Sequence, residues 1–245
     1  MFGKGKKKWK IGHLSDPGRI RRLNEDSVYV DEKKGLFVLA DGMGGHNAGE
    51  VASSLAVNLV GSMIQSELRA GVDPLELVTS AIARANADIL LESESKSAWN
   101  EMGTTLLVTL MVDQKMIIAH VGDSRAYSIK NGTITQLTED HTFVADWVKR
   151  GLITKEQARR HHQRHGLTEA IGITEDVRID LLVRDRVENE RLLLCSDGLT
   201  EMIEDEEILT IVSPAKNPQA ACNKLIEAAN TSGGRDNITV ILIFT

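Results

Sequence analysis

Short acidic sites stand at the ends of apolar segments in this 245-residue chain. They are Glu25-Asp26, Asp41-Gly42, Asp197-Gly198 and Asp236-Asn237, together with Asp123, which follows the apolar residues 116–122. Buried strands that end in carboxylates can bring those groups to one point, where they repel one another unless a cation lies among them. Hard oxygen ligands of this kind suit Mg²⁺ or Mn²⁺ rather than Zn²⁺. The pattern therefore predicts a metal-dependent enzyme.

A turn is the alternative interpretation of each Asp-Gly pair, because this dipeptide is common in β-hairpins. Asp41, however, is followed by a glycine-rich segment and then by a helical pattern rather than by a second strand. Residues 199–202, after Asp197, also fit a helical turn. Five such sites in one chain favour the metal interpretation over a series of unrelated turns.

Composition sets limits on the class of protein. The net charge of −6 argues against a nucleic-acid binder, and we expect the basic cluster from Lys4 to Lys10 to be a solvated tail. No apolar run approaches the length of a membrane span, and the N-terminus lacks the apolar stretch of a signal peptide. Cys195 and Cys222 lie in apolar patterns, which predicts buried, reduced thiols. We expect a soluble, cytoplasmic monomer that contacts neither nucleic acid nor membrane.

The chain shows no internal repeat and no linker, so a single domain over residues 1–245 is expected. Asn131-Gly132 predicts a hairpin, and apolar faces over residues 51–63 and 75–89 and after Asn217 predict helices. The expected strands fall at about residues 27–31, 36–41, 104–112, 115–121, 124–129, 133–137, 179–184, 190–196 and 238–244. Several strands follow one another without a helix between them, which favours an α+β fold with antiparallel sheets and helices on their outer faces.

Residues 141–172 have a different character and predict a helical flap near the site. The flap contains an amphipathic piece that ends at Gly151, then a capping box made by Thr154 and Gln157. The segment His161-His-Gln-Arg-His165 follows. No cysteine or aspartate is spaced to complete a zinc site with these histidines, so a solvated or substrate-facing flap is the better interpretation.

Several families are excluded by single residues. A phosphate-binding P-loop would need lysine where Glu50 stands, and a dinucleotide-binding loop would need glycine where Asn47 stands. A cysteine phosphatase would need arginine where Glu201 stands, six positions after Cys195. In this chain about fourteen residues separate Asp26 from Asp41. That is too few for the helix, strand and second helix that a phospho-acceptor receiver domain needs between its acidic pair and its next aspartate.

Six motifs together resemble one family closely, over nearly the whole chain from about Gly12 to Thr245. They are Arg21-x-x-Asn-Glu-Asp26, Asp41-Gly-Met-Gly-Gly-His46 with Ala48-Gly-Glu50, Gly103-Thr-Thr105, Gly122-Asp-Ser-Arg125, Ser196-Asp-Gly-Leu-Thr200 and Gly234-Arg-Asp-Asn-Ile-Thr239. They are similar to the bacterial branch of the PPM/PP2C-type, metal-dependent serine/threonine protein phosphatases. The resemblance implies a four-layer α-β-β-α sandwich, in which two antiparallel sheets pack face to face around a binuclear metal centre.

The resemblance also implies a ligand set for two Mn²⁺ or Mg²⁺ ions. Asp41 would bridge both ions, Asp197 and Asp236 would complete one, and Glu25 with the carbonyl group of Gly42 would complete the other. Such a centre would activate a water molecule for in-line attack on phosphorus, and no covalent intermediate is required.

Further roles follow from the same resemblance. Asp26 would accept a hydrogen bond from metal-bound water, and Asp123 with Asp197 matches the pair that often holds a third ion in bacterial members. A strand-end turn is the alternative for Asp123. Arg21 would grip the substrate phosphate, since a guanidinium fork matches two phosphate oxygens. Membership of a surface run of arginines is the alternative for Arg21.

The sequence departs from the family at the proton donor and in the flap. Met43 stands where eukaryotic members carry a histidine, so the general acid is open among His46, His161 and metal-bound water, with His161 the first choice. Bacterial relatives commonly have His-Pro-x-Arg-Asn in the flap, whereas His162 and His165 replace the proline and the asparagine here. The expected partners are phosphorylated proteins, namely a Ser/Thr kinase and the proteins that this kinase modifies. A hydrolase of small phosphoesters and a silent phospho-binding module are the alternatives.

Overall fold

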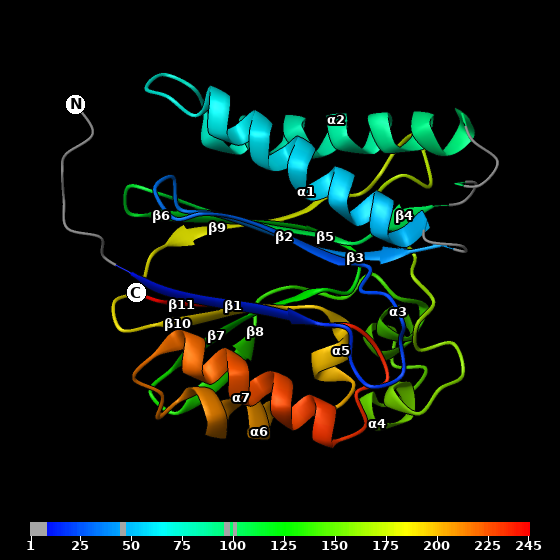
Figure 1. The fold of residues 1–245 in the computed structure, drawn as a ribbon, viewed down its shortest axis with the longest axis vertical. Coiled ribbons are helices and arrows are strands. Elements are labelled where there is room, and N and C mark those ends of the chain that lie inside the picture. The colour runs from blue at the N-terminus through cyan, green and yellow to red at the C-terminus, as the bar shows by residue number, and fades with distance from the viewer. Residues whose placement is uncertain (1–8, 45–47, 96–98, 100–101) are drawn as a thin grey trace.

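The computed structural model describes residues 9–44, 48–95, 99 and 102–245. Two antiparallel sheets lie face to face, and each is covered on its outer side by helices, so the molecule has four layers (Figure 1). The predicted α+β class and its four-layer arrangement are confirmed.

The first sheet follows the strand order β2-β3-β5-β6-β9, with the short strand β4 paired to the end of β3. Its central strands are almost wholly apolar because both of their faces are covered. In β3, Leu36, Val38 and Ala40 pack with the helices, while Phe37 and Leu39 face the second sheet. The strands are β2 (Asp26–Asp31), β3 (Leu36–Met43), β4 (Gly103–Thr104), β5 (Leu106–Val112), β6 (Lys115–Val121) and β9 (Asp180–Asp185).

The second sheet follows the order β1-β11-β10-β7-β8. The predicted hairpin at Asn131-Gly132 joins β7 and β8, and both residues have positive φ angles, 52° and 73°, as a type I′ turn requires. The edge strand β1 was not predicted, because residues 10–16 lack a β-branched run, and its pairing with β11 forms it. The strands are β1 (Lys10–Asp16), β7 (Arg125–Lys130), β8 (Thr133–Gln136), β10 (Arg191–Cys195) and β11 (Ile238–Phe244).

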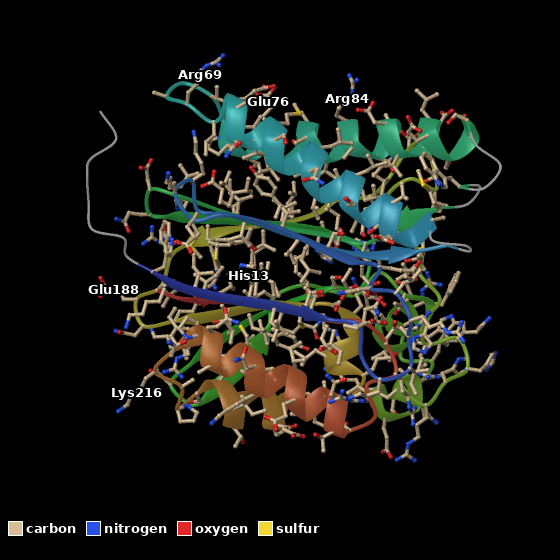
Figure 2. The ribbon with its side chains drawn as sticks, in the orientation of Figure 1. His13, Arg69, Glu76, Arg84, Glu188 and Lys216 are labelled. Carbon is tan, nitrogen blue, oxygen red and sulfur yellow. The ribbon has the colours of Figure 1, made fainter. Side chains whose placement is uncertain are left out.

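Helices α1 (Ala48–Glu67) and α2 (Pro74–Ser95) cover the first sheet, and α5 (Asp197–Thr200), α6 (Asp205–Val212) and α7 (Pro218–Thr231) cover the second. The charged side chains of Arg69, Glu76 and Arg84 project outward from the first helical layer (Figure 2), as expected for its solvated face. As predicted, α7 begins at an Asn217 cap with proline in its first turn, whereas α6 was not predicted. Within the described residues, no helix is long and apolar enough to cross a membrane.

The predicted flap contains α3 (Phe143–Lys149) and α4 (Lys155–Arg159), which lie beside α5 at the side of the molecule away from the C-terminus (Figure 1). The capping box of Thr154 and Gln157 is present. The two ends of the flap are tied together, since Thr142 and Leu167 form an isolated antiparallel bridge. The flap therefore leaves and rejoins the sheets at neighbouring points, and its two ends are hydrogen-bonded to each other.

Candidate metal centre

Asp26 and Asp41 lie directly opposite each other on two neighbouring strands of the first sheet. They are paired in the register of β2 and β3, where β2 begins and β3 approaches its end. Directly opposed residues of an antiparallel pair have Cβ atoms about 5 Å apart. Two like charges at that separation destabilise the sheet unless a proton or a cation lies between them.

Ser196 brings the second sheet to this acidic pair. Its hydroxyl group donates to Oδ2 of Asp26 across 2.8 Å. The Ser196 hydroxyl oxygen in turn accepts from the backbone N–H of Thr239 at 3.0 Å. Asp197 follows Ser196 and begins α5. A Cβ atom on Gly198 would lie only 2.0 Å from the carbonyl oxygen of Asn237, so glycine allows the chain segments that carry Asp197 and Asp236 to approach closely.

Glu25 and Gly42 are joined where the first sheet ends and α1 begins. The backbone N–H of Gly42 donates to the carbonyl oxygen of Glu25 across 3.1 Å. A Cβ atom on Gly42 would lie 2.0 Å from the carbonyl oxygen of Gly49. Only glycine permits this approach, and it places the Gly42 backbone beside Glu25.

The charges of these residues act on one another. Burial, followed by the negative charges of Asp26 and Asp197, raises the pKa of Asp41 well above its usual value. Burial raises the pKa of Asp26 to about 7, although hydrogen bonds with Thr239 and Ser196 oppose the shift. Burial also raises the pKa of Glu25, and the nearby Arg21 opposes that change.

The donor set fits a divalent cation. Oδ1 of Asp26 is buried and has no hydrogen-bond partner among the described residues. The raised pKa values show that these carboxylates are costly to ionise together without a compensating positive charge. Every predicted ligand offers oxygen, which Mg²⁺ and Mn²⁺ prefer.

Comparison with known proteins agrees with this geometry. The chain matches the family described as Protein phosphatase 2C over residues 21–224. The chain belongs to that family. It is 41% identical to the serine/threonine phosphatase stp of Listeria monocytogenes serotype 4b (strain F2365), over 94% of this chain and 93% of the relative.

Solved structures show the same fold. The crystal structure of the Mycobacterium tuberculosis serine/threonine phosphatase PstP/Ppp superposes with a TM-score of 0.89 at 37% identity, covering 96% of this chain and 98% of that one. The catalytic domain of PstP in complex with two manganese ions gives a TM-score of 0.87 at 36% identity, with coverage of 96% and 97%. The protein is a metal-dependent serine/threonine protein phosphatase, and the predicted enzyme class is confirmed.

Arg21 of the phosphatase lies at the edge of the acidic cluster. Its Nη2 atom donates to Oδ2 of Asp236 across 2.8 Å, and its side chain is 50% exposed. Burial alone would lower the pKa of Arg21, but Asp236 and, more weakly, Glu25 and Asp41 raise it. The role of Arg21 in gripping a phosphate stays a prediction.

Asp123 lies near Asp197, the residue with which it would hold a third ion. Burial raises its pKa, and the charge of Asp197 adds to the shift. The guanidinium of Arg125 makes three hydrogen bonds with the Asp140 carboxylate, and its positive charge opposes the rise in the pKa of Asp123. The negative charge of Asp123 in turn raises the pKa of Asp41, so Asp123 lies near the acidic cluster, and its role as a ligand stays a prediction.

The flap histidines occupy different surroundings. His161 packs edge-on against Trp147 with ring centroids 5.1 Å apart, and its Nδ1 accepts from the backbone N–H of Gln163. His165 instead reaches the cluster, with Nδ1 2.9 Å from Oε1 of Glu201 and 3.9 Å from Oδ2 of Asp197.

The nearby carboxylates of Asp197 and Glu201 raise the pKa of His165, although burial opposes the shift. Sequence reasoning did not assign His165 or Glu201 to the site, although the departure from asparagine at position 165 was a usable signal. His46 lies outside the described residues, and His161 stays a prediction.

Proposed function

We propose that this phosphatase removes phosphate from phosphoserine and phosphothreonine in proteins that a Ser/Thr kinase has modified, and that it acts as a monomer with two Mn²⁺ or Mg²⁺ ions. The observation that carries the proposal is the convergence of carboxylates from both sheets, joined by the hydrogen bond from Ser196 to Asp26. The two manganese ions in the similar PstP structure support the choice of metal. A silent binding module is disfavoured because every predicted metal carboxylate is present.

Each residue has a distinct task in this mechanism. Asp41, Asp197, Asp236, Glu25 and the carbonyl group of Gly42 would hold the ions. When bound, the ions supply an activated water nucleophile and offset charge on the phosphoryl oxygens.

Asp26 would orient that water. Ser196 donates a hydrogen bond to Oδ2 of the Asp26 carboxylate. The other oxygen, Oδ1, has no partner among the described residues and can accept a hydrogen bond from the water. Arg21 would grip the phosphate. With a third ion in place, Asp123 and Asp197 would hold it.

The Arg21→Ala variant is expected to raise KM for a phosphopeptide by about 10- to 100-fold with a smaller change in kcat. A hydrogen bond to a charged group contributes about 1.5–3 kcal/mol, and loss of a contact made equally in the ground state appears in KM. Steady-state kinetics with Arg22→Ala as the matched control would test this. Unchanged kinetics for Arg21→Ala would return the residue to the surface run of arginines.

Loss of the leaving-group proton donor is expected to slow phosphopeptide hydrolysis by about 10²–10⁴-fold. The same loss should affect p-nitrophenyl phosphate much less, because p-nitrophenolate departs without a proton. Because His161 is the first choice of proton donor, we expect this result for His161→Ala. The matched comparison is His165→Asn, which restores the asparagine common in relatives. Equal effects on both substrates for both variants would remove the flap histidines from proton transfer and leave water as the donor.

The substrate class can be tested directly with a panel of phosphopeptides beside small phosphoesters, all in Mn²⁺. We expect the highest kcat/KM for phosphothreonine and phosphoserine peptides, with an Asp197→Asn variant as the inactive control. A higher kcat/KM for small phosphoesters would instead support the alternative hydrolase.

A further inference from the structure

A pair of buried histidines lies between the flap and the segment that carries Asp123. His120 and His141 are 4% and 1% exposed, and their ring centroids are 4.6 Å apart. Nε2 of His120 lies 2.8 Å from the carbonyl oxygen of Glu139, and Nε2 of His141 lies 3.2 Å from Oδ2 of Asp180. By spacing alone, the two histidines and Asp180 could be taken for a metal site.

The hydrogen bonds of His141 argue against a cation at this cluster. The backbone N–H of Gly122 donates to Nδ1 of His141 across 3.2 Å, so Nδ1 carries a lone pair and the neutral ring has its proton on Nε2. A metal-ligating histidine has the opposite arrangement, in which the second nitrogen donates its own N–H to an acceptor. The carboxylate of Asp180, 3.2 Å away, favours this tautomer because its negative charge attracts a proton on Nε2.

The backbone of His141 joins the flap to the same glycine. Its N–H donates to the carbonyl oxygen of Gly122 across 2.9 Å, and its carbonyl oxygen accepts from the N–H of Thr168 at 2.9 Å. The two ends of the flap continue this pairing through residues 142–143 and 166–167. One buried residue therefore connects both ends of the flap to the segment that precedes Asp123.

From that segment the connection continues to the metal centre. The hydroxyl groups of Ser124 and Thr105 are 2.8 Å apart. Oγ1 of Thr105 accepts from the backbone N–H of Asp41 at 2.9 Å. The Asp123 segment is thus held by Thr105 on one side and by His141 on the other.

We propose that His141 is a positioning residue that, through Nδ1, holds the Asp123 segment in the conformation that binds a cation and couples the flap to that site. The inference rests on the proposed role of Asp123 as a ligand. Loss of a group that orients a metal ligand typically costs about 10–100-fold in metal affinity or activity.

Two matched substitutions separate the nitrogens of His141. Asparagine places an amide oxygen near the position of Nδ1 and can still accept from Gly122. Glutamine reaches the position of Nε2 and leaves the Gly122 N–H without its acceptor. Mn²⁺ binding, followed by the electron paramagnetic resonance signal of free Mn²⁺, should show one site weakened about 10–100-fold in His141→Gln and in Asp123→Asn. His141→Asn should restore the affinity, and saturating Mn²⁺ should recover kcat in His141→Gln.

The outcomes distinguish the inference from the site on which it rests. Unchanged Mn²⁺ binding in Asp123→Asn would overturn the proposed third cation site and the inference with it. Weakened binding in Asp123→Asn but not in His141→Gln would overturn the inference alone, as would equal losses in the two His141 variants.

If His141→Gln does not fold, Asp180→Ala provides the same test from a partly exposed position, because it removes the acceptor that favours a proton on Nε2. We expect it to weaken the same Mn²⁺ site, and unchanged affinity would overturn the inference.

Discussion

Replacing Asp41 with asparagine is expected to lower kcat/KM for phosphopeptides by at least about 10³-fold. Asparagine keeps the shape of the side chain but removes the charge that would bridge two cations. Metal ions contribute several kcal/mol of charge stabilisation to reactions of this kind, and each 1.36 kcal/mol corresponds to tenfold in rate. Steady-state kinetics in saturating Mn²⁺ would measure the loss.

The Asp88→Asn variant is the matched control, because Asp88 pairs with Arg84 on the outer surface of α2. It should keep the wild-type rate. The metal-free Asp41→Asn protein should also melt at a higher temperature than the metal-free wild type, since one of several mutually repelling carboxylates is gone. Near-normal activity of Asp41→Asn would exclude this residue as a bridging ligand.

Removal of the metal is expected to abolish activity, and addition of Mn²⁺ should restore it. A chelator would be applied to the purified protein and then removed before metals are added back singly, with phosphopeptide hydrolysis as the measurement. Ca²⁺ provides a control for charge alone, because it favours larger, more flexible coordination than Mn²⁺ or Mg²⁺. Full turnover by metal-stripped protein in chelator would contradict the mechanism.

The stability of the metal-free protein is expected to depend on pH. Asp26 has a pKa of about 7 in the folded protein against a usual value of 3.8. A carboxyl group with a raised folded-state pKa binds its proton more tightly when folded, so the metal-free protein loses stability as pH rises from about 4 through about 7. Bound Mn²⁺ replaces the missing positive charge.

Mn²⁺ should therefore raise the melting temperature more at about pH 8 than at about pH 6, where protons compete for the same oxygens. Thermal melts with and without Mn²⁺ across this range would show the difference. An increase in melting temperature that is independent of pH would indicate that the raised pKa of Asp26 has no part in metal binding.

Much of the fold could be predicted from local signals in the sequence. Asn131-Gly132 specified a hairpin because its residues tolerate positive φ. Asn217 with Pro218 specified a helix start because the asparagine side chain satisfies a free N–H and proline needs none. The acidic residues at strand ends were visible for a similar reason, since a carboxylate interrupts an apolar segment wherever it occurs.

Long-range contacts decided what the sequence left open. Strand β1 exists because β11, more than two hundred residues later, offers it an unpaired edge. Likewise, the Ser196 hydroxyl reaches Asp26 only because the two sheets stack.

The flap illustrates the same limit at the active site. His161 and His165 lie four residues apart and carry the same chemistry, yet one packs on Trp147 and the other contacts Glu201. Residue types set which groups could act in this phosphatase. Which of them meet depends on how the flap packs against α5, and that packing energy is distributed over distant parts of the chain.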